Sequence, residues 1–329
     1  MALPSRGSDW GRLAGTVVLS LFLYYVNVLF FLFLVPLQVS YVRRGSKEFT
    51  LSAAVTLVGI GLLSLWRTSG LQLGSERLLV MAVEIVSALT LVVGVYVVTT
   101  EWTRVRRRLN RMLFAAVGAG VVSIPLVVLL SQSKGFLNLL HAQVQAAMTL
   151  IRASFSSGAD LQAADPLFNV DKLSAFIRVM LLRDYVFAYF LILAAVWRIS
   201  TMFTQRIASS RPAPLSEFYL PEVLLWPVLV SWALVLADKL LGLGIAGYIG
   251  WNLGMIGAFL YALQGIGIIQ FLFARHHVTR GLRILFVSAL IVLLFWPGVG
   301  MVVLVAFPIF GISELWIRYG RGQVEEPEE

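Results

Sequence analysis

Long apolar stretches, separated by short polar and basic segments, dominate the chain. Eight stretches each hold roughly the ~20 apolar residues that a helix needs to cross a bilayer. They lie at residues 13–39, 49–66, 78–100, 112–131, 185–204, 223–241, 249–273 and 284–311. The pattern predicts an all-α, polytopic integral membrane protein, a bundle of about eight transmembrane helices forming a single membrane domain over residues 1–329.

The first stretch has two interpretations. It continues to Tyr41 and contains Asn27 and Pro36, both of which are unfavourable inside a transmembrane helix. It is therefore either one tilted helix or a tight hairpin of two short helices.

Basic residues set the predicted orientation. The loops after the first, third, fifth and seventh stretches carry about twice as many arginines and lysines as the opposite loops. This bias places those loops in the cytoplasm and both chain ends outside, although a hairpin at the first stretch would bring the N-terminus inside. The same pattern accounts for the net charge of +9, so we expect no nucleic-acid binding. We expect a multi-pass membrane protein.

Residues 132–184 are predicted to form an extramembrane amphipathic helical insertion. A first helix is indicated by apolar residues spaced three and four apart, namely Leu137, Leu140, Val144, Met148, Ile151 and Phe155. A second helix follows Pro166, with Asp171 as its cap. The two helices either lie on the membrane surface or cover an outward-facing cavity. Residues 321–329 are predicted to be an acidic, disordered tail.

Three glycines mark one face of the seventh stretch. Gly250, Gly254 and Gly257 share this face with Tyr261 and Gln264, because all five lie within roughly 40° of one direction on a helix. Glycines allow a neighbouring helix or a ligand to approach the backbone closely. The phenol and the amide need partners at membrane depth. The pattern therefore predicts either a ligand-binding face or a helix-packing face.

Other polar residues complete the set of site candidates. A carboxylate at Glu84, inside the third stretch, must be protonated, paired or facing a cavity. Glu222 and Trp226 lie where the sixth stretch begins, and Asn252 points nearly opposite to Tyr261. The hypothetical ligand-binding residues are Tyr261, Gln264, Gly257, Gly254, Glu222, Trp226, Asn252 and Glu84.

Several classes of chemistry are not expected. The chain has no cysteine, and its three histidines are too poorly spaced for a convincing metal site. Neither a GxxxxGK[ST] loop nor an HExxH motif occurs, so we expect no enzyme, no cofactor and no metal. The basic loop from Arg104 to Arg111 either sets topology and attracts anionic lipid or docks a cytoplasmic partner subunit.

Several segments resemble a known family. They are VPLQVSYVRRGSKEFTLSAAV, FYLPEVLLWPVLVSWALVLAD, a GWN turn, FLYALQGIGIIQFLFAR and a closing GISELWIR. Together they resemble the YybS-like family of uncharacterised bacterial membrane proteins, most sharply over residues 218–320. The positions that match the family are Pro221, Glu222, Trp226, Asn252, Tyr261, Gln264, Gly265, Gly311 and Glu314.

The resemblance carries an implication about function. The YybS-like fold is distantly similar to the S-components of energy-coupling-factor transporters, which bind a small molecule and lean on a partner module. It therefore implies a small organic solute and a transport-related role. S-components often carry an AxxxA pattern in the first span, but here Ala14 is followed by Val18. The alternative hypothesis is a non-catalytic membrane scaffold or assembly factor. A third is an intramembrane enzyme, which would need two or more converging acid–base groups, and the sequence offers no obvious pair.

Overall fold

The protein is all-helical in the computed structural model, as the sequence predicts. The structure describes residues 6–26, 30–69, 77–100, 108–154, 170–204, 214–296, 298–317 and 319. The α-helices are α1 (Arg6–Val26), α2 (Leu34–Arg44), α3 (Ser46–Ser69), α4 (Arg77–Thr99), α5 (Arg108–Gln132), α6 (Lys134–Ser154), α7 (Val170–Arg183), α8 (Tyr185–Thr204), α9 (Leu225–Leu241), α10 (Ile245–Arg275), α11 (Arg280–Phe295) and α12 (Val299–Ser313). Short 3-10 helices are η1 (Phe30–Phe33), η4 (Leu215–Glu217) and η5 (Glu222–Leu224).

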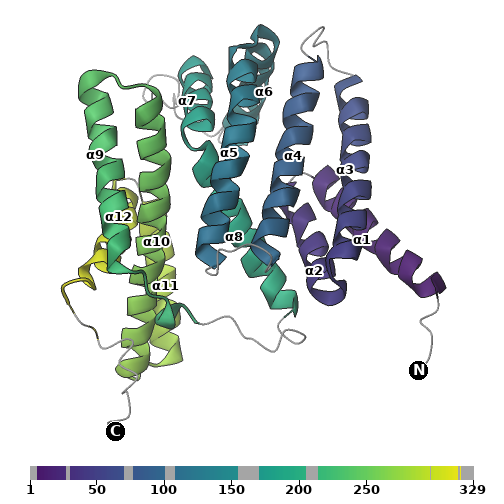
Figure 1. Cartoon of the computed structure of the whole chain (residues 1–329). Helices are drawn as coiled ribbons and strands as arrows, with labels where there is room; N and C mark the ends of the chain where they lie inside the picture. Colours follow the sequence, from purple (N-terminus) through teal and green to yellow (C-terminus); the bar gives the residue numbers. More distant parts are fainter. Residues whose placement is uncertain are drawn as a thin grey trace. The chain divides into compact units, whose positions relative to one another are not determined.

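Contacts along the chain define two compact units, whereas the sequence pattern treats residues 1–329 as one membrane domain. The first unit covers Met1–Ser210 and contains α1 to α8 (Figure 1). The second covers Arg211–Glu329 and contains α9 to α12. Each unit buries its own polar residues.

Six helices of the described chain are long and apolar enough to cross a membrane. They are Ser46–Ser69, Arg77–Thr99, Leu109–Leu129, Tyr185–Thr204, Glu222–Leu241 and Ile245–Arg275. These correspond to the second through seventh predicted stretches. The GWN segment, expected to be a turn, lies inside α10, because that helix begins before it at Ile245.

The first predicted stretch is a pair of helices rather than one span. α1 runs beside α3 in the same direction, since Leu21 contacts Gly59 while Tyr24 reaches the region of Ser64. α2 then returns, and its Gln38 donates a hydrogen bond to Thr99 at the end of α4. The start of α1 and the end of α2 therefore lie at the same end of the unit, the lower one in Figure 1.

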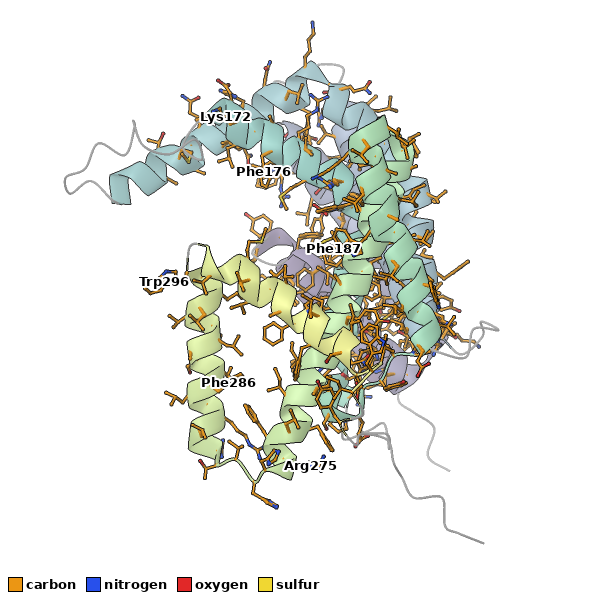
Figure 2. The ribbon with its side chains drawn as sticks, turned by 90° about the vertical axis from the view of Figure 1, so that its left-hand side faces the viewer. Lys172, Phe176, Phe187, Arg275, Phe286 and Trp296 are labelled. Carbon is orange, nitrogen blue, oxygen red and sulfur yellow. The ribbon has the colours of Figure 1, made fainter. Side chains whose placement is uncertain are left out.

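The last predicted stretch is also two helices. α11 and α12 are separated at Gly298, which has a φ of 80°. Each helix is shorter than the span of about 30 Å that a bilayer core requires, because 16 and 15 residues rise only about 24 and 22 Å. Figure 2 shows Arg275 near the start of α11, Phe286 along it and Trp296 at its far end.

This hairpin reverses the predicted side of the C-terminus. Beyond α12, the carbonyl of Tyr319 accepts a hydrogen bond from Arg275 at the end of α10, at 3.1 Å. The chain therefore returns to the end of α10 at Arg275, next to the start of α11, which carries Arg280 and Arg283. The positive-inside rule predicts that this end is cytoplasmic, so we expect the residues after α12 on the cytoplasmic side, and not outside as eight full spans would place them. The acidic tail at 321–329 lies outside the described residues.

The region predicted to be an amphipathic insertion contains two helices, α6 and α7. They contact each other, and His141 on α6 lies 3.6 Å from the carboxylate of Asp171 on α7. Val144 and Met148 of the predicted apolar stripe are buried, whereas Phe155 and Pro166 lie outside the described residues. Whether these helices lie on the membrane surface stays a prediction.

The two hairpins predict that both chain ends face the cytoplasm. Because the protein has no native cysteine, Ser8→Cys or Gln323→Cys introduces a single labelling site. Neither variant should react with a membrane-impermeant maleimide on intact cells, and both should react after permeabilisation. Ser75→Cys, between α3 and α4, is the control that should react on intact cells. Labelling of Gln323→Cys from outside would contradict the returning hairpin.

Candidate functional site

The carboxylate of Glu84 lies at the centre of a polar cluster in the first unit. Tyr24 on α1 donates a hydrogen bond to Glu84 Oε1 at 2.6 Å, and Ser64 on α3 donates one to Oε2 at 2.6 Å. The guanidinium of Arg67 lies 3.7 Å from Oε1. Three helices therefore contribute to one carboxylate, which is paired as the sequence requires.

A cavity of about 170 Å³ opens beside this carboxylate. It is lined by Tyr24, Phe30, Phe33, Arg67, Glu84, Ser87, Ala88 and Leu91. Its walls are mostly apolar, and Arg67 and Glu84 are the two charged residues among them. Glu84 is 21% exposed and Arg67 is 39% exposed, so neither is sealed within protein. The arrangement is a mostly apolar hollow with a few convergent polar groups, and it is smaller than the roughly 300–1,000 Å³ of drug-sized ligand pockets.

The break between α1 and α2 positions one wall of the cavity. Phe33 is fully buried, and its ring packs edge-on against Tyr24, with centroids 5.4 Å apart. This contact holds the Tyr24 hydroxyl toward Glu84. α1 can approach α3 because Gly59 has no side chain where Leu21 packs. If the first helix continued without a break, Phe30 and Phe33 would lie beyond Glu84 along the helix. They line the cavity only because the chain turns between α1 and α2.

Glu84 lies in the membrane half nearer to the α3–α4 loop. It is seven residues from Arg77, the first residue of α4, which is about 10 Å along the helix. Arg67 is close to the end of α3 and approaches from the same side. A carboxylate at this depth is costly unless partnered, and long arginine side chains reach such depths from the interface.

A row of hydroxyl groups continues from the cavity into the unit. Ser87, on the cavity wall, lies 3.2 Å from the hydroxyl of Tyr185, which lies 3.4 Å from that of Tyr189. Tyr189 in turn lies 2.6 Å from Thr90, and Thr90 lies 3.5 Å from Ser123. The row connects α4, α5 and α8, so the wall of the cavity is fixed by hydrogen bonds to other helices.

The glycine face of α10 packs against α9 in the second unit. A side chain at Gly257 would overlap Val228, and a Cβ at Gly250 would lie 2.8 Å from the Ser231 carbonyl oxygen. At Gly254 the nearest atoms belong to the Trp232 ring, 3.2 Å from an added Cβ. The predicted face is therefore occupied by a helix of the same chain. Ligand binding by these glycines stays a prediction.

Tyr261 lies where α10 crosses α12. Gly311 of α12 contacts the backbone carbonyl of Tyr261, and Gly265 of α10 contacts the carbonyl of Phe307. Each helix thus offers a glycine to the other's backbone, which allows a close crossing. Tyr261 is fully buried, and its hydroxyl has no hydrogen-bond partner within the described part of the chain.

Gln264 joins three segments of the second unit. Its side-chain oxygen accepts a hydrogen bond from the backbone N–H of Leu220 at 3.1 Å, and its amide nitrogen donates one to Glu314 at 2.7 Å. Gln264 is fully buried, and Glu314 is 8% exposed. Five of the family-like positions therefore meet where α10 crosses the end of α12, namely Tyr261, Gln264, Gly265, Gly311 and Glu314.

The structure does not bring the other candidates to either cluster. Glu222 is exposed in η5, and Trp226 is 68% exposed at the start of α9. Asn252 is buried and donates a hydrogen bond to the carbonyl of Tyr248, one turn earlier in α10. Residues 101–107 of the basic loop, which include Arg104, Arg106 and Arg107, lie outside the described residues.

The sequence pointed to Glu84 but not to its surroundings. Ser64 and Arg67 share one face near the end of α3, a spacing that could have suggested a polar partner for a carboxylate on the next helix. In the sequence, Arg67 is simply one of the basic loop residues that predict membrane orientation, and nothing there links it to Glu84. Within the described chain, no three His, Cys, Asp or Glu side chains are placed to hold a metal ion.

Close packing at Gly257 predicts a loss of stability on enlargement. Gly257→Leu should lower the free energy of unfolding by about 1–3 kcal/mol, because the new side chain would overlap Val228. Equilibrium unfolding in mixed micelles measures this. Gly281→Leu is the matched control, since nothing lies within 4 Å of a Cβ at Gly281. Equal stability of the two variants would show that the α9–α10 contact contributes little.

The contacts of Gln264 predict a second effect on stability. Gln264→Leu keeps the size of the side chain but removes the partner of the Leu220 N–H and one donor to Glu314. We expect a loss of about 1–3 kcal/mol in the free energy of unfolding. Gln270→Leu, an exposed position on the same helix, should be close to neutral. A neutral Gln264→Leu would contradict a structural role.

Comparison with known proteins supplies a family. The chain matches the family described as "Predicted membrane protein (DUF2232)" over residues 14–312. This match includes Glu84 with its partners, Gln264, and all six helices that are long and apolar enough to cross a membrane, and it ends two residues before Glu314. No curated protein and no solved structure matches the chain. Since the match covers most of the sequence, the chain belongs to the DUF2232 family of predicted membrane proteins.

Proposed function

We propose that this protein binds a small solute in the cavity beside Glu84 and acts in its transport across the membrane. One observation carries the proposal: a carboxylate at membrane depth opens into a cavity of about 170 Å³. Ionisable residues in membrane-spanning segments commonly mark the paths of substrates or ions. The site therefore lies in the first unit, not on the glycine face of α10.

The hydrogen bonding of Glu84 leaves capacity for a ligand. A carboxylate has about four lone-pair positions, and Tyr24 and Ser64 use two of them. Arg67, at 3.7 Å, lies beyond normal hydrogen-bond distance. A carboxylate retained only to join helices would be enclosed by its donors. This one instead faces a hollow that Ser87 and apolar side chains also line.

The resemblance to YybS-like proteins supports the same function. It implies a solute-binding role similar to that of S-components, and a location in the bacterial inner membrane. On this basis a partner module would supply energy. We propose no catalytic activity for this protein.

The scaffold hypothesis remains the alternative. Packing of the glycine face against α9 is what a ligand-free scaffold would show, but a solute-binding protein could use the same packing. The polar cavity favours the solute, because a scaffold has no need to keep an open space beside a carboxylate.

Native mass spectrometry of the gently solubilised protein tests the proposal. We expect a bound small molecule whose occupancy falls at least tenfold in Glu84→Ala. Glu222→Gln is the control, because that carboxylate is exposed and distant in sequence from the cavity residues. Its occupancy should match that of the unaltered protein.

Two outcomes would overturn the proposal. One is a stoichiometric protein partner with no small molecule, which would favour the scaffold. The other is a small molecule that is retained in Glu84→Ala but lost in Gln264→Ala, which would move the site to the second unit.

A further inference from the structure

Two opposite charges border the same cavity. Glu84 supplies a carboxylate and Arg67 a guanidinium, and both line the hollow. We propose that the ligand is a small zwitterion carrying one ammonium and one carboxylate group, such as a short apolar amino acid. This inference rests on the proposed solute-binding function and specifies its substrate class.

The long contact between the two charges leaves hydrogen-bonding capacity on both of them for a ligand that lies beside the pair. Charge-assisted hydrogen bonds between a guanidinium and a carboxylate are about 2.7–2.9 Å long, whereas Arg67 and Glu84 are 3.7 Å apart. The pair therefore does not form the two short parallel hydrogen bonds of a bidentate ion pair. The guanidinium has five N–H donors in a planar fork that fits a ligand carboxylate. The free lone pairs of Glu84 can accept from an ammonium.

Charge balance favours a zwitterion over a singly charged solute. The cavity edge carries one positive and one negative group, which sum to zero. A lone cation or anion would add a net charge at membrane depth, where desolvation is costly. A zwitterion can pair both of its charges with both of the protein's charges and leave the site neutral.

The size and walls of the cavity limit the rest of the ligand. A cavity of about 150 Å³ accommodates benzene, with six non-hydrogen atoms. The 170 Å³ beside Glu84 therefore suits about six to eight such atoms, the range from alanine to valine. Phe30, Phe33 and Leu91 would surround an apolar side chain, while Ser87 lies on the polar wall.

Binding measurements with matched probes test the substrate class. Isothermal titration of the full chain in nanodiscs would compare L-alanine and L-valine with propionate and ethylamine, which carry one charge each. We expect at least one amino acid to bind tenfold or more tightly than either single-charge probe. Because this comparison uses the unaltered protein, it does not depend on the stability of any variant.

Two conservative variants then separate the roles of the charges. Glu84→Gln should weaken amino-acid binding at least tenfold, and Arg67→Gln should do the same. The control pair is Arg44→Gln and Glu48→Gln, an ion pair at 2.9 Å between the end of α2 and the start of α3. These controls should bind as the unaltered protein does. Melting temperatures of all four variants show which are folded.

The outcomes distinguish the substrate class from the function. If propionate or ethylamine binds as tightly as the amino acids, the zwitterion is wrong while a solute site at Glu84 stands. The same follows if mass spectrometry finds a Glu84-dependent molecule that is not zwitterionic. If no small molecule binds in either experiment, the proposed function fails as well.

Discussion

The need to partner polar groups inside the membrane organises both units. Hydrocarbon offers no hydrogen bonds, so a carboxylate or amide at membrane depth must find partners on other segments. Glu84 takes donors from α1 and α3, and thereby fixes how these helices approach α4. Gln264 joins α10 to Leu220 and Glu314. Apolar contacts alone would leave these helices free to slide, because lipid tails are as apolar as the helices themselves.

Helix content was predictable, and Asn27 and Pro36 allowed for a break in the first stretch, but the break in the last stretch was not predicted. Six apolar stretches became single helices, because length and hydropathy suffice to define a span. The first and last stretches are also long and apolar, yet they form α1 with α2 and α11 with α12. What separates a span from a hairpin there is tertiary: Tyr24 and Phe33 pack together near Glu84, and Tyr319 is held by Arg275. Hydropathy does not encode such contacts.

The candidate site was predictable in part, for a related reason. Helical spacing correctly placed Gly250, Gly254 and Gly257 on one face, but periodicity cannot say whether a helix or a ligand fills it, and α9 does. The cost of burying charge singled out Glu84. Its donors come from positions 60 and 20 residues away in sequence, and only the fold brings these together.

The two polar centres satisfy the same constraint in different ways, and the difference bears on function. Gln264 is completely buried and uses both ends of its amide within the chain. Glu84 keeps one fifth of its side chain exposed, next to an open volume and a guanidinium whose nearest nitrogen is 3.7 Å away. A closed centre gains stability from every bond it makes. An open one gives up part of that stability, and a ligand with complementary charges would restore it on binding.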